Sequence, residues 1–359
     1  MKQEAEPATA ELTELAPGVI RSQLPVELPG LGHVNCYILP DADGVAVVDP
    51  GLPGEESWQA LVDRLGQAGE SVQRVHTIIV THSHYDHFGG AARLRDESGA
   101  RVVAHASFRS FWDSSEAAEM LDIDDVDPEE PEVVPPWARS VVTPWGSRRE
   151  PRPEQVDRWN ALGVDKRWYR TPTRDVGLVE ADVISLAGRD WVAVHTPGHT
   201  HDHLCLYDPV EGVMLSGDHV LPTITPHIGG FNSQPDPLDA FFDSLGRMHD
   251  FSDVSVVAPA HGHPFSDLAG RADEIADHHR ERLNRLREAA VGHGSATVRE
   301  LSKEIFRPAV WGDLADSETY THLEHLRLHG HVTVSDRDGV LVYDATSSDP
   351  ADSGPRDAG

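Results

Sequence analysis

Hydrophobic positions over residues 12–48 fall into short runs that Gly, Pro and Asp residues separate. The segments GVIRSQLPV, VNCYILPD and ADGVAVVDPG are typical of successive β-strands, and the Asp-Gly pair in the third is a turn signal. We therefore predict a β-meander over this region.

The next part of the chain alternates between helical and strand patterns. Residues 55–69 have apolar positions at helical spacing, and residues 75–81 (VHTIIVT) form a β-branched run typical of a strand buried on both faces. We predict a helix over 88–99 and a strand over 101–106. A β-rich start followed by alternating strands and helices indicates a layered α/β fold.

Residues 109–175 interrupt this alternation. They contain the acidic stretch DIDDVDPEEPE, many prolines, and tryptophans at positions 112, 137, 145, 159 and 168. Linkers without structure are poor in aromatic residues, so we predict an insertion that packs as a lid or wall over a pocket. A surface decoration that only adds stability is the alternative.

The strand pattern resumes after the insertion, and a different pattern follows it. Apolar strand-like runs cover 176–196, 203–209, 212–218 and 254–262, and a long amphipathic helix follows over about 268–291. Helices are predicted over 296–306 and 317–330, and a hairpin over 331–344. We accordingly predict a catalytic domain over 1–267, the long helix with a winged-helix-like module over 268–345, and a disordered tail over 346–359.

The charge and the hydrophobic content of the chain argue against nucleic-acid and membrane partners and bear on its location in the cell. A net charge of −30 over 359 residues repels phosphate backbones, so no nucleic-acid partner is expected. No apolar run approaches the ~18 residues of a membrane span, and the acidic first segment lacks the features of a secretory signal. We predict a cytoplasmic protein without a membrane partner. Cys36 and Cys205 lie in apolar runs and are expected to be buried rather than in a disulfide or zinc site.

The strongest chemical signal is the segment HSHYDH directly after the predicted strand 75–81. Alternate residues of an extended chain point the same way, so His82 and His84 can bind one ion. Asp86 and His87, where the chain turns into a helix, can face a second ion. Imidazole and carboxylate ligands without cysteine suit zinc, and also iron or manganese.

Three later segments each carry a candidate ligand at the end of an apolar strand. His199 lies in HTPGHT, Asp218 in SGD and His261 in AHG. Each pattern alone is weak, since such pairs are usually turns. Their shared placement predicts that the loops converge at one edge of the sheets.

The ordered motifs THSHYDH, TPGHT, SGD and AHG resemble the metallo-β-lactamase-fold hydrolase superfamily over about residues 12–265. The resemblance implies a four-layer αββα sandwich in which His82, His84 and His199 hold one metal and Asp86, His87 and His261 hold another. Asp218 matches the bridging carboxylate. Asp49 in VVDPG matches a residue that supports the metal loop.

The segment TPGHTHDH and the closing module are similar to glyoxalase-II-like thioesterases and β-lactamase-like proteins with a carboxyl-terminal winged helix. The resemblance implies two zinc ions that activate water, with Asp86 as the catalytic residue, and hydrolysis of a small-molecule ester, thioester or lactone. A homodimer stays open.

Two other activities on this fold are alternatives: a mononuclear iron persulfide dioxygenase, and a phosphodiesterase or ribonuclease. Further histidines beside the motifs could contact substrate or orient ligands, and no catalytic role is assigned to them: His201, His203, His219, His227 and His263.

Overall fold

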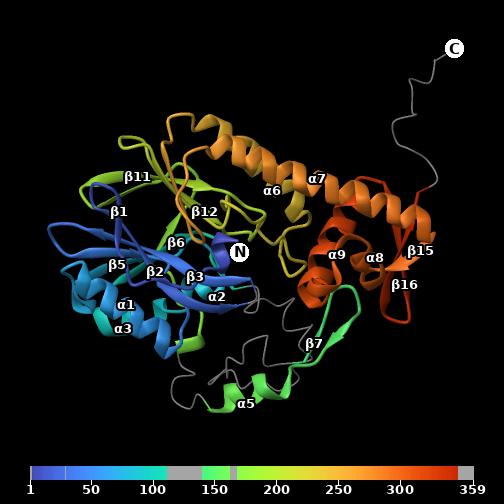
Figure 1. Cartoon of the computed structure of the whole chain (residues 1–359), viewed down its shortest axis with the longest axis horizontal. Coiled ribbons are helices and arrows are strands. Elements are labelled where there is room, and N and C mark those ends of the chain that lie inside the picture. The colour runs from blue at the N-terminus through green and yellow to red at the C-terminus, as the bar shows by residue number, and fades with distance from the viewer. Residues whose placement is uncertain (1, 29, 111–139, 162–167, 347–359) are drawn as a thin grey trace.

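The structure is a computed structural model that describes residues 2–28, 30–110, 140–161 and 168–346. Two β-sheets lie face to face, and helices cover their outer faces (Figure 1). The seven-stranded sheet has the order β1-β2-β3-β4-β5-β6-β9, and the five-stranded sheet has the order β10-β11-β12-β13-β14.

The strands of the first sheet are β1 (Thr13–Ala16), β2 (Val19–Leu28), β3 (Leu31–Pro40), β4 (Val45–Val48), β5 (Val75–Ile79), β6 (Arg101–His105) and β9 (Val176–Leu178). Those of the second are β10 (Val183–Leu186), β11 (Arg189–His195), β12 (Leu204–Asp208), β13 (Val213–Gly217) and β14 (Val256–Pro259). The outer helices are α1 (Glu55–Gln67) and α3 (Ala91–Ser98) on the first sheet, and α6 (Pro237–Gly246) and α7 (Leu268–His293) on the second. Shorter elements are α2 (Tyr85–Phe88), α5 (Pro153–Ala161), and the 3-10 turns η1 (Gln3–Ala5), η2 (Val72–Arg74), η6 (Arg247–Asp250) and η7 (Pro308–Val310).

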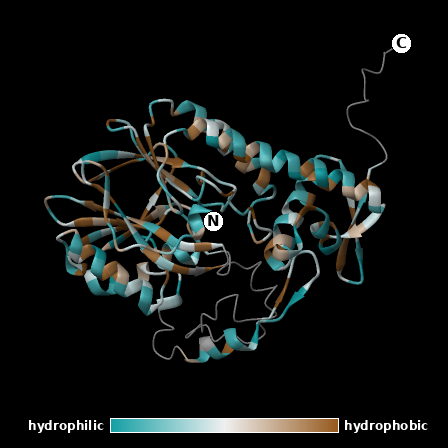
Figure 2. Ribbon diagram, in the orientation of Figure 1, coloured by the Kyte–Doolittle hydropathy of each residue, from teal (hydrophilic) through white to brown (hydrophobic). Residues whose placement is uncertain are grey.

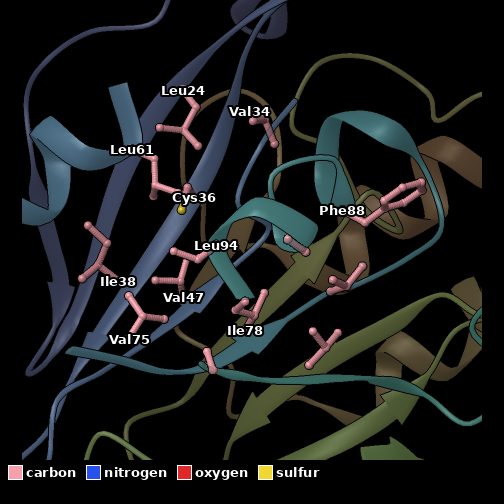
Figure 3. Packing of buried hydrophobic residues seen from close by; sticks show 14 of the residues in the cluster. Leu24, Val34, Cys36, Ile38, Val47, Leu61, Val75, Ile78, Phe88 and Leu94 are labelled. Atoms are coloured by element: carbon pink, nitrogen blue, oxygen red, sulfur yellow. The ribbon is translucent and has the colours of Figure 1, made fainter. Parts of the chain in front are cut away.

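Both faces of the central strands are buried, which explains their continuous apolar sequence. In β3, Cys36 and Ile38 pack toward Leu61 of α1 (Figure 3). Tyr37 and Leu39 of the same strand pack into the core between the two sheets. This alternation follows from the two-residue period of a strand. A third core lies between the second sheet and helices α6 and α7. The predicted four-layer α/β fold is confirmed.

Hydrophobic residues gather on the strands between the layers, and hydrophilic residues cover the outer helices (Figure 2). Cys36 and Cys205 are both buried and free, as predicted. Within the described ranges, no helix is both long and apolar enough to span a membrane.

Strand direction brings the motif-bearing loops to one edge. β13 and β14 are parallel, and β11 runs the same way because it is separated from β13 by the antiparallel β12. The end of β5 meets this edge from the other sheet, where the Leu204 amide donates to the Thr81 carbonyl at 2.8 Å. The loops after β5, β11, β13 and β14 therefore meet.

The predicted helices need two corrections. The helix expected over 88–99 is α3, which begins only at Ala91, because the Gly90 amide donates to the Gly51 carbonyl at 2.8 Å instead of continuing the turn of α2. Asp86 and His87 thus lie on a separate helical turn. Helix α6 was not predicted, although the Asp236 side chain caps it by accepting from the Asp239 amide.

The carboxyl-terminal part has its own core. Helices α8 (Val298–Ile305) and α9 (Asp313–Leu328) pack with α7 and the sheet β15-β17-β16, formed by β15 (Ser295–Thr297), β17 (Val340–Ala345) and β16 (Val332–Arg337). Two helices and a hairpin appear in the predicted order. The winged-helix assignment and the domain boundaries stay predictions.

Parts of two predicted segments lie outside the described residues. These are the acidic stretch, Trp112 and Trp137 of the insertion, and residues 347–359 of the expected tail. The hydroxyl of Thr346, the last described residue, donates to the Gly330 carbonyl at 3.0 Å. The insertion also forms a hairpin from β7 (Val141–Val142) and β8 (Arg148–Arg149).

Candidate metal centre

The structure brings together all seven candidate ligands predicted from the motifs. They form two groups whose potential ligand atoms lie within 4.8 Å of one another: His82, His84, His199 and Asp218, and Asp86, His87 and His261. The loop after β5 and helix α2 supply four of them, and the loops after β11, β13 and β14 supply one each. This arrangement suits metal binding.

The first group points three imidazole nitrogens at one place. Nδ1 of His84 lies 3.1 Å from Nε2 of His82 and 3.0 Å from Nε2 of His199. Nδ1 of His199 donates to the His227 carbonyl at 2.7 Å, which leaves a lone pair on its Nε2. Two nitrogens bound at about 2.0–2.1 Å to a tetrahedral ion would lie about 3.3 Å apart, so the observed spacing fits such an ion.

His82 is oriented in the same way. The Thr81 hydroxyl donates to Asp49 at 2.7 Å, so Thr81 Oγ1 accepts from Nδ1 of His82, which lies 3.0 Å away. Nε2 of His82 therefore faces the other ligands with a lone pair.

The second group surrounds the Asp86 carboxylate. Its Oδ2 lies 3.3 Å from Nε2 of His261 and 3.4 Å from Nε2 of His87. Nδ1 of His87 donates to Asp49 at 2.9 Å, and Nδ1 of His261 donates to the His33 carbonyl at 2.6 Å. Among the described residues, neither buried Nε2 has a hydrogen-bond partner. A cation would satisfy both nitrogens.

Asp218 lies between the two groups. Its Oδ2 is 3.5 Å from Nε2 of His199 and 3.6 Å from Nε2 of His87, and its Oδ1 is 3.5 Å from Nε2 of His261. Its backbone amide donates to Nε2 of His203 at 3.0 Å, which fixes the loop. One carboxylate thus reaches both groups.

The protonation states of these residues favour the binding of a cation. Burial raises the pKa of Asp86, but the nearby His87 and His261 lower it by more than burial raises it. The pKa of Asp86 therefore lies well below its usual range, and the carboxylate is ionised. Burial and His199 lower the pKa of His84 to about 3, so this imidazole is neutral. Burial lowers the pKa of His87, but Asp86, Asp218 and Asp49 raise it well above its usual value. These carboxylates attract positive charge to the centre, and metal binding would replace the proton on His87.

Asp49 supports the loop that carries the first motif. It is buried with a φ of 54°, and its carboxylate accepts from the Thr81 amide at 2.9 Å as well as from Thr81 Oγ1 and His87. Asp49 binds the ligand loop rather than standing among the candidate ligands, as the resemblance implies.

Sequence reasoning missed the residues that hold the His261 loop. Nδ1 of His33 donates to the Glu6 carbonyl at 2.8 Å, and its Nε2 accepts from the Gly262 amide at 3.1 Å. A second missed residue, the buried Glu4, holds a different segment by accepting from the amides of Thr223 and Ile224 at 2.8 and 3.0 Å. Nothing in the local sequence around these isolated residues indicates such long-range contacts.

A pocket of about 250 Å³ opens beside the first group, with His84 and His199 in its lining. Arg149 of β8 and Leu314 and Ser317 of α9 also line it. The predicted insertion and the carboxyl-terminal part therefore both supply its walls.

The two wall-forming parts contact each other. The Leu341 amide of the carboxyl-terminal hairpin donates to the Trp145 carbonyl at 3.2 Å. The ring of Trp145 lies 5.3 Å from that of Tyr320 on α9. A Cβ on Gly146 would lie 1.9 Å from the Gly339 carbonyl oxygen, so glycine permits this close approach.

The five additional histidines occupy different places. His201 and His227 line the pocket, and His203 holds the Asp218 backbone. His219 is buried 5.4 Å from the ring of Phe241, and His263 pairs with Glu6 at 2.7 Å near the surface.

Residues 29–289 match the metallo-beta-lactamase superfamily, and the chain belongs to this family of hydrolases. Its fold is similar to that of a metallo-beta-lactamase family protein from Thermus thermophilus, with 28% identity, a TM-score of 0.71, and coverage of 93% of this chain and 100% of that one. A beta-lactamase domain protein from Burkholderia ambifaria is 25% identical with a TM-score of 0.72, over 94% of this chain and 96% of that one.

Curated relatives extend the comparison to named hydrolases. The probable metallo-hydrolase YqjP of Bacillus subtilis is 24% identical over 87% of this chain and 93% of its own length. A hydroxyacylglutathione hydrolase of Pseudomonas syringae is 24% identical over 67% of this chain and 66% of its own length. An atrochrysone carboxyl ACP thioesterase of Aspergillus chevalieri is 33% identical, over 36% of this chain and 41% of its own length.

Proposed function

We propose that this protein is a binuclear metal-dependent hydrolase that cleaves an ester, thioester or lactone bond of a small molecule. The observation that carries the proposal is the position of the Asp218 carboxylate, whose two oxygens face ligand nitrogens of both groups. Two zinc ions fit this set of donors, and iron or manganese would also fit.

In this proposal His82, His84 and His199 hold one ion, and Asp86, His87 and His261 hold the other, with Asp218 between them. When bound, such a pair of ions supplies hydroxide at neutral pH and polarises the carbonyl of the substrate. The proposed catalytic residue is Asp86. Its buried, ionised carboxylate can orient the attacking water or accept its proton.

The bond type is supported by relatives and by charge. The Pseudomonas syringae and Aspergillus chevalieri proteins are named as a hydroxyacylglutathione hydrolase and a thioesterase. A net charge of −30 opposes a nucleic-acid substrate. A small-molecule substrate is therefore part of the proposal, and the cytoplasmic location expected from the sequence is proposed with it.

The test combines elemental analysis with a panel of glutathione and acyl-CoA thioesters, a homoserine lactone, a cephalosporin and a phosphodiester. We expect two equivalents of metal per chain and the highest kcat/KM on an ester-type substrate. Asp218→Ala should lose metal and turnover. His249→Ala, which removes a surface pair with Asp273 at 3.0 Å, is the control and should retain both.

Full turnover by metal-free protein would overturn the proposal. One equivalent of iron, with oxygen uptake on a glutathione persulfide, would support the dioxygenase alternative. Preference for the phosphodiester would support the nuclease alternative.

A further inference from the structure

His227, a pocket residue outside the two ligand groups, contacts a side chain of the carboxyl-terminal part of the chain. His227 lines the pocket, and its side chain is 33% exposed. Its Nδ1 lies 3.4 Å from Oε2 of Glu318 on α9. None of the sequence motifs includes either residue.

Glu318 is fixed as an ionised carboxylate. It is buried and forms an ion pair with Arg282 of α7. Burial raises its pKa, but Arg282 and the hydrogen bond to His227 lower it well below its usual range. Because a carboxylate only accepts hydrogen bonds, His227 presents its Nδ1 hydrogen to Glu318. With Nδ1 directed at Glu318, Nε2 is the ring nitrogen left to face a ligand.

Helix α9 also holds the backbone around His227. The Gly230 amide donates to Oγ of Ser317 at 2.9 Å, and the His227 carbonyl accepts from Nδ1 of His199. The segment therefore contacts a candidate metal ligand through its backbone, while its imidazole faces the pocket. His227 lines the same pocket as the candidate ligands His84 and His199.

Glycine keeps Nε2 of His227 uncovered. A Cβ at the pocket-lining residue Gly229 would lie 3.0 Å from this nitrogen. Among the described residues, Nε2 of His227 has no hydrogen-bond partner of its own. The pocket thus contains a preoriented acceptor beside the proposed metal centre.

We propose that His227 is a substrate-binding residue whose Nε2 accepts a hydrogen bond from a donor group next to the scissile carbonyl. Glu318 is the positioning residue, which makes the carboxyl-terminal part of the chain a component of the site. The substrate class is an acyl compound with a hydroxyl or amide N–H near the reacting carbonyl. This inference rests on the proposed hydrolase function.

The test uses three N-acetylcysteamine thioesters that differ only at carbon 2 of a propanoyl group: a hydroxyl, an acetamido group and a methoxy group. The first two carry a donor and the third does not. We expect the wild-type kcat/KM to favour a donor-bearing substrate over the methoxy one by roughly twofold to tenfold, as one hydrogen bond between neutral groups allows. The hydroxyl and acetamido arms distinguish the two donors.

The expected signature in variants is loss of preference with retention of metal. His227→Ala should reduce the ratio to near one, and His227→Gln, which keeps a side-chain acceptor, should restore part of it. Glu318→Gln should weaken the preference by less than His227→Ala. The matched control is Asp316→Asn, which breaks the ion pair of another buried α9 carboxylate, with Arg299 at 3.0 Å, outside the pocket lining. It should keep the wild-type ratio.

A wild-type ratio in metal-loaded His227→Ala would overturn the inference, as would loss of metal in both His227 variants, which would show a role through His199. Equal wild-type rates on all three thioesters would also overturn it, while leaving the hydrolase proposal intact. Failure of wild type to hydrolyse any member of the larger panel would instead refute the hydrolase.

Discussion

Replacing Asp49 with Asn tests whether Asp49 orients the ligand loop and the imidazole of His87. The carboxylate accepts three hydrogen bonds, from the Thr81 amide, the Thr81 hydroxyl and Nδ1 of His87, at 2.7–2.9 Å. The amide of Asn retains one oxygen acceptor and introduces an N–H₂ group. At least one donor then loses its partner. Asn also tolerates the positive φ of 54° at this position, so the substitution adds little backbone strain.

The cost can be worked out from these contacts. A hydrogen bond to a charged group contributes about 1.5–3 kcal/mol, so we expect the metal-free variant to lose about 2 kcal/mol of unfolding free energy. If the His87 ring changes tautomer to meet the new amide, its Nε2 carries a hydrogen and can no longer bind metal. Residues in this supporting position typically change metal affinity by about 10- to 100-fold.

The assay is competition with a chromophoric chelator to determine both metal dissociation constants, together with urea unfolding of metal-free protein. Asp41→Asn is the matched control, because Asp41 accepts from His76 at 3.1 Å far from the centre. It should keep wild-type metal affinity. An Asp49→Asn protein that binds both metals as tightly as wild type would refute the reasoning.

Three further predictions concern packing, pH and metal. Gly198 has a φ of 134°, and a Cβ there would lie 2.4 Å from the Cβ of Phe241. Gly198→Ala should therefore displace His199, lower the free energy of unfolding in urea by about 1–3 kcal/mol and reduce the metal content. A wild-type unfolding free energy and a wild-type metal content would contradict this. Burial lowers the pKa of His219 to about 3, so the unfolded chain binds a proton at higher pH than the folded one, and stability should fall as pH drops from 6.5 toward 3. The metal-free His219→Leu protein should show a shallower decline, by up to about 1.4 kcal/mol per pH unit, and an unchanged slope would exclude this source. Removing metal with a chelator should lower the thermal midpoint, because a metal at about 100 times its dissociation constant stabilises the folded protein by about 2.7 kcal/mol. Identical melting curves with and without chelator would count against metal binding by the folded protein.

The layered α/β fold and the convergence of the motif-bearing loops could be predicted from local patterns, whereas the four-layer sandwich and the two ligand sets were implied by the resemblance to the family. The VHTIIVT run indicates a doubly buried strand, and His82 and His84 follow it directly in sequence. Residues His199, Asp218 and His261 each end another apolar strand. Strand ends that share an edge bring their loops together whatever the loops contain.

Residues that act through distant contacts could not be predicted in this way. Glu318 lies 91 positions after His227, inside a helix whose sequence indicates only amphipathic packing. Its role depends on how α9 packs against the loop of His227, which no local period encodes. Helix α6 is different, because the Asp-Pro pair at 236–237 is a start signal that was available in the sequence.

The contact between Trp145 and the carboxyl-terminal hairpin has a consequence for engineering. The β7–β8 hairpin supplies Arg149 to the pocket lining, and α9 supplies Leu314 and Ser317. The β16–β17 hairpin, which packs with α9, contacts the β7–β8 hairpin at Gly146 and Gly339. A chimaera that exchanges one of them with a relative would place mismatched surfaces together. Exchanging the β7–β8 hairpin together with α9 and the β16–β17 hairpin would keep these contacts matched, transfer the pocket lining that they carry, and leave the strands that present the histidines untouched.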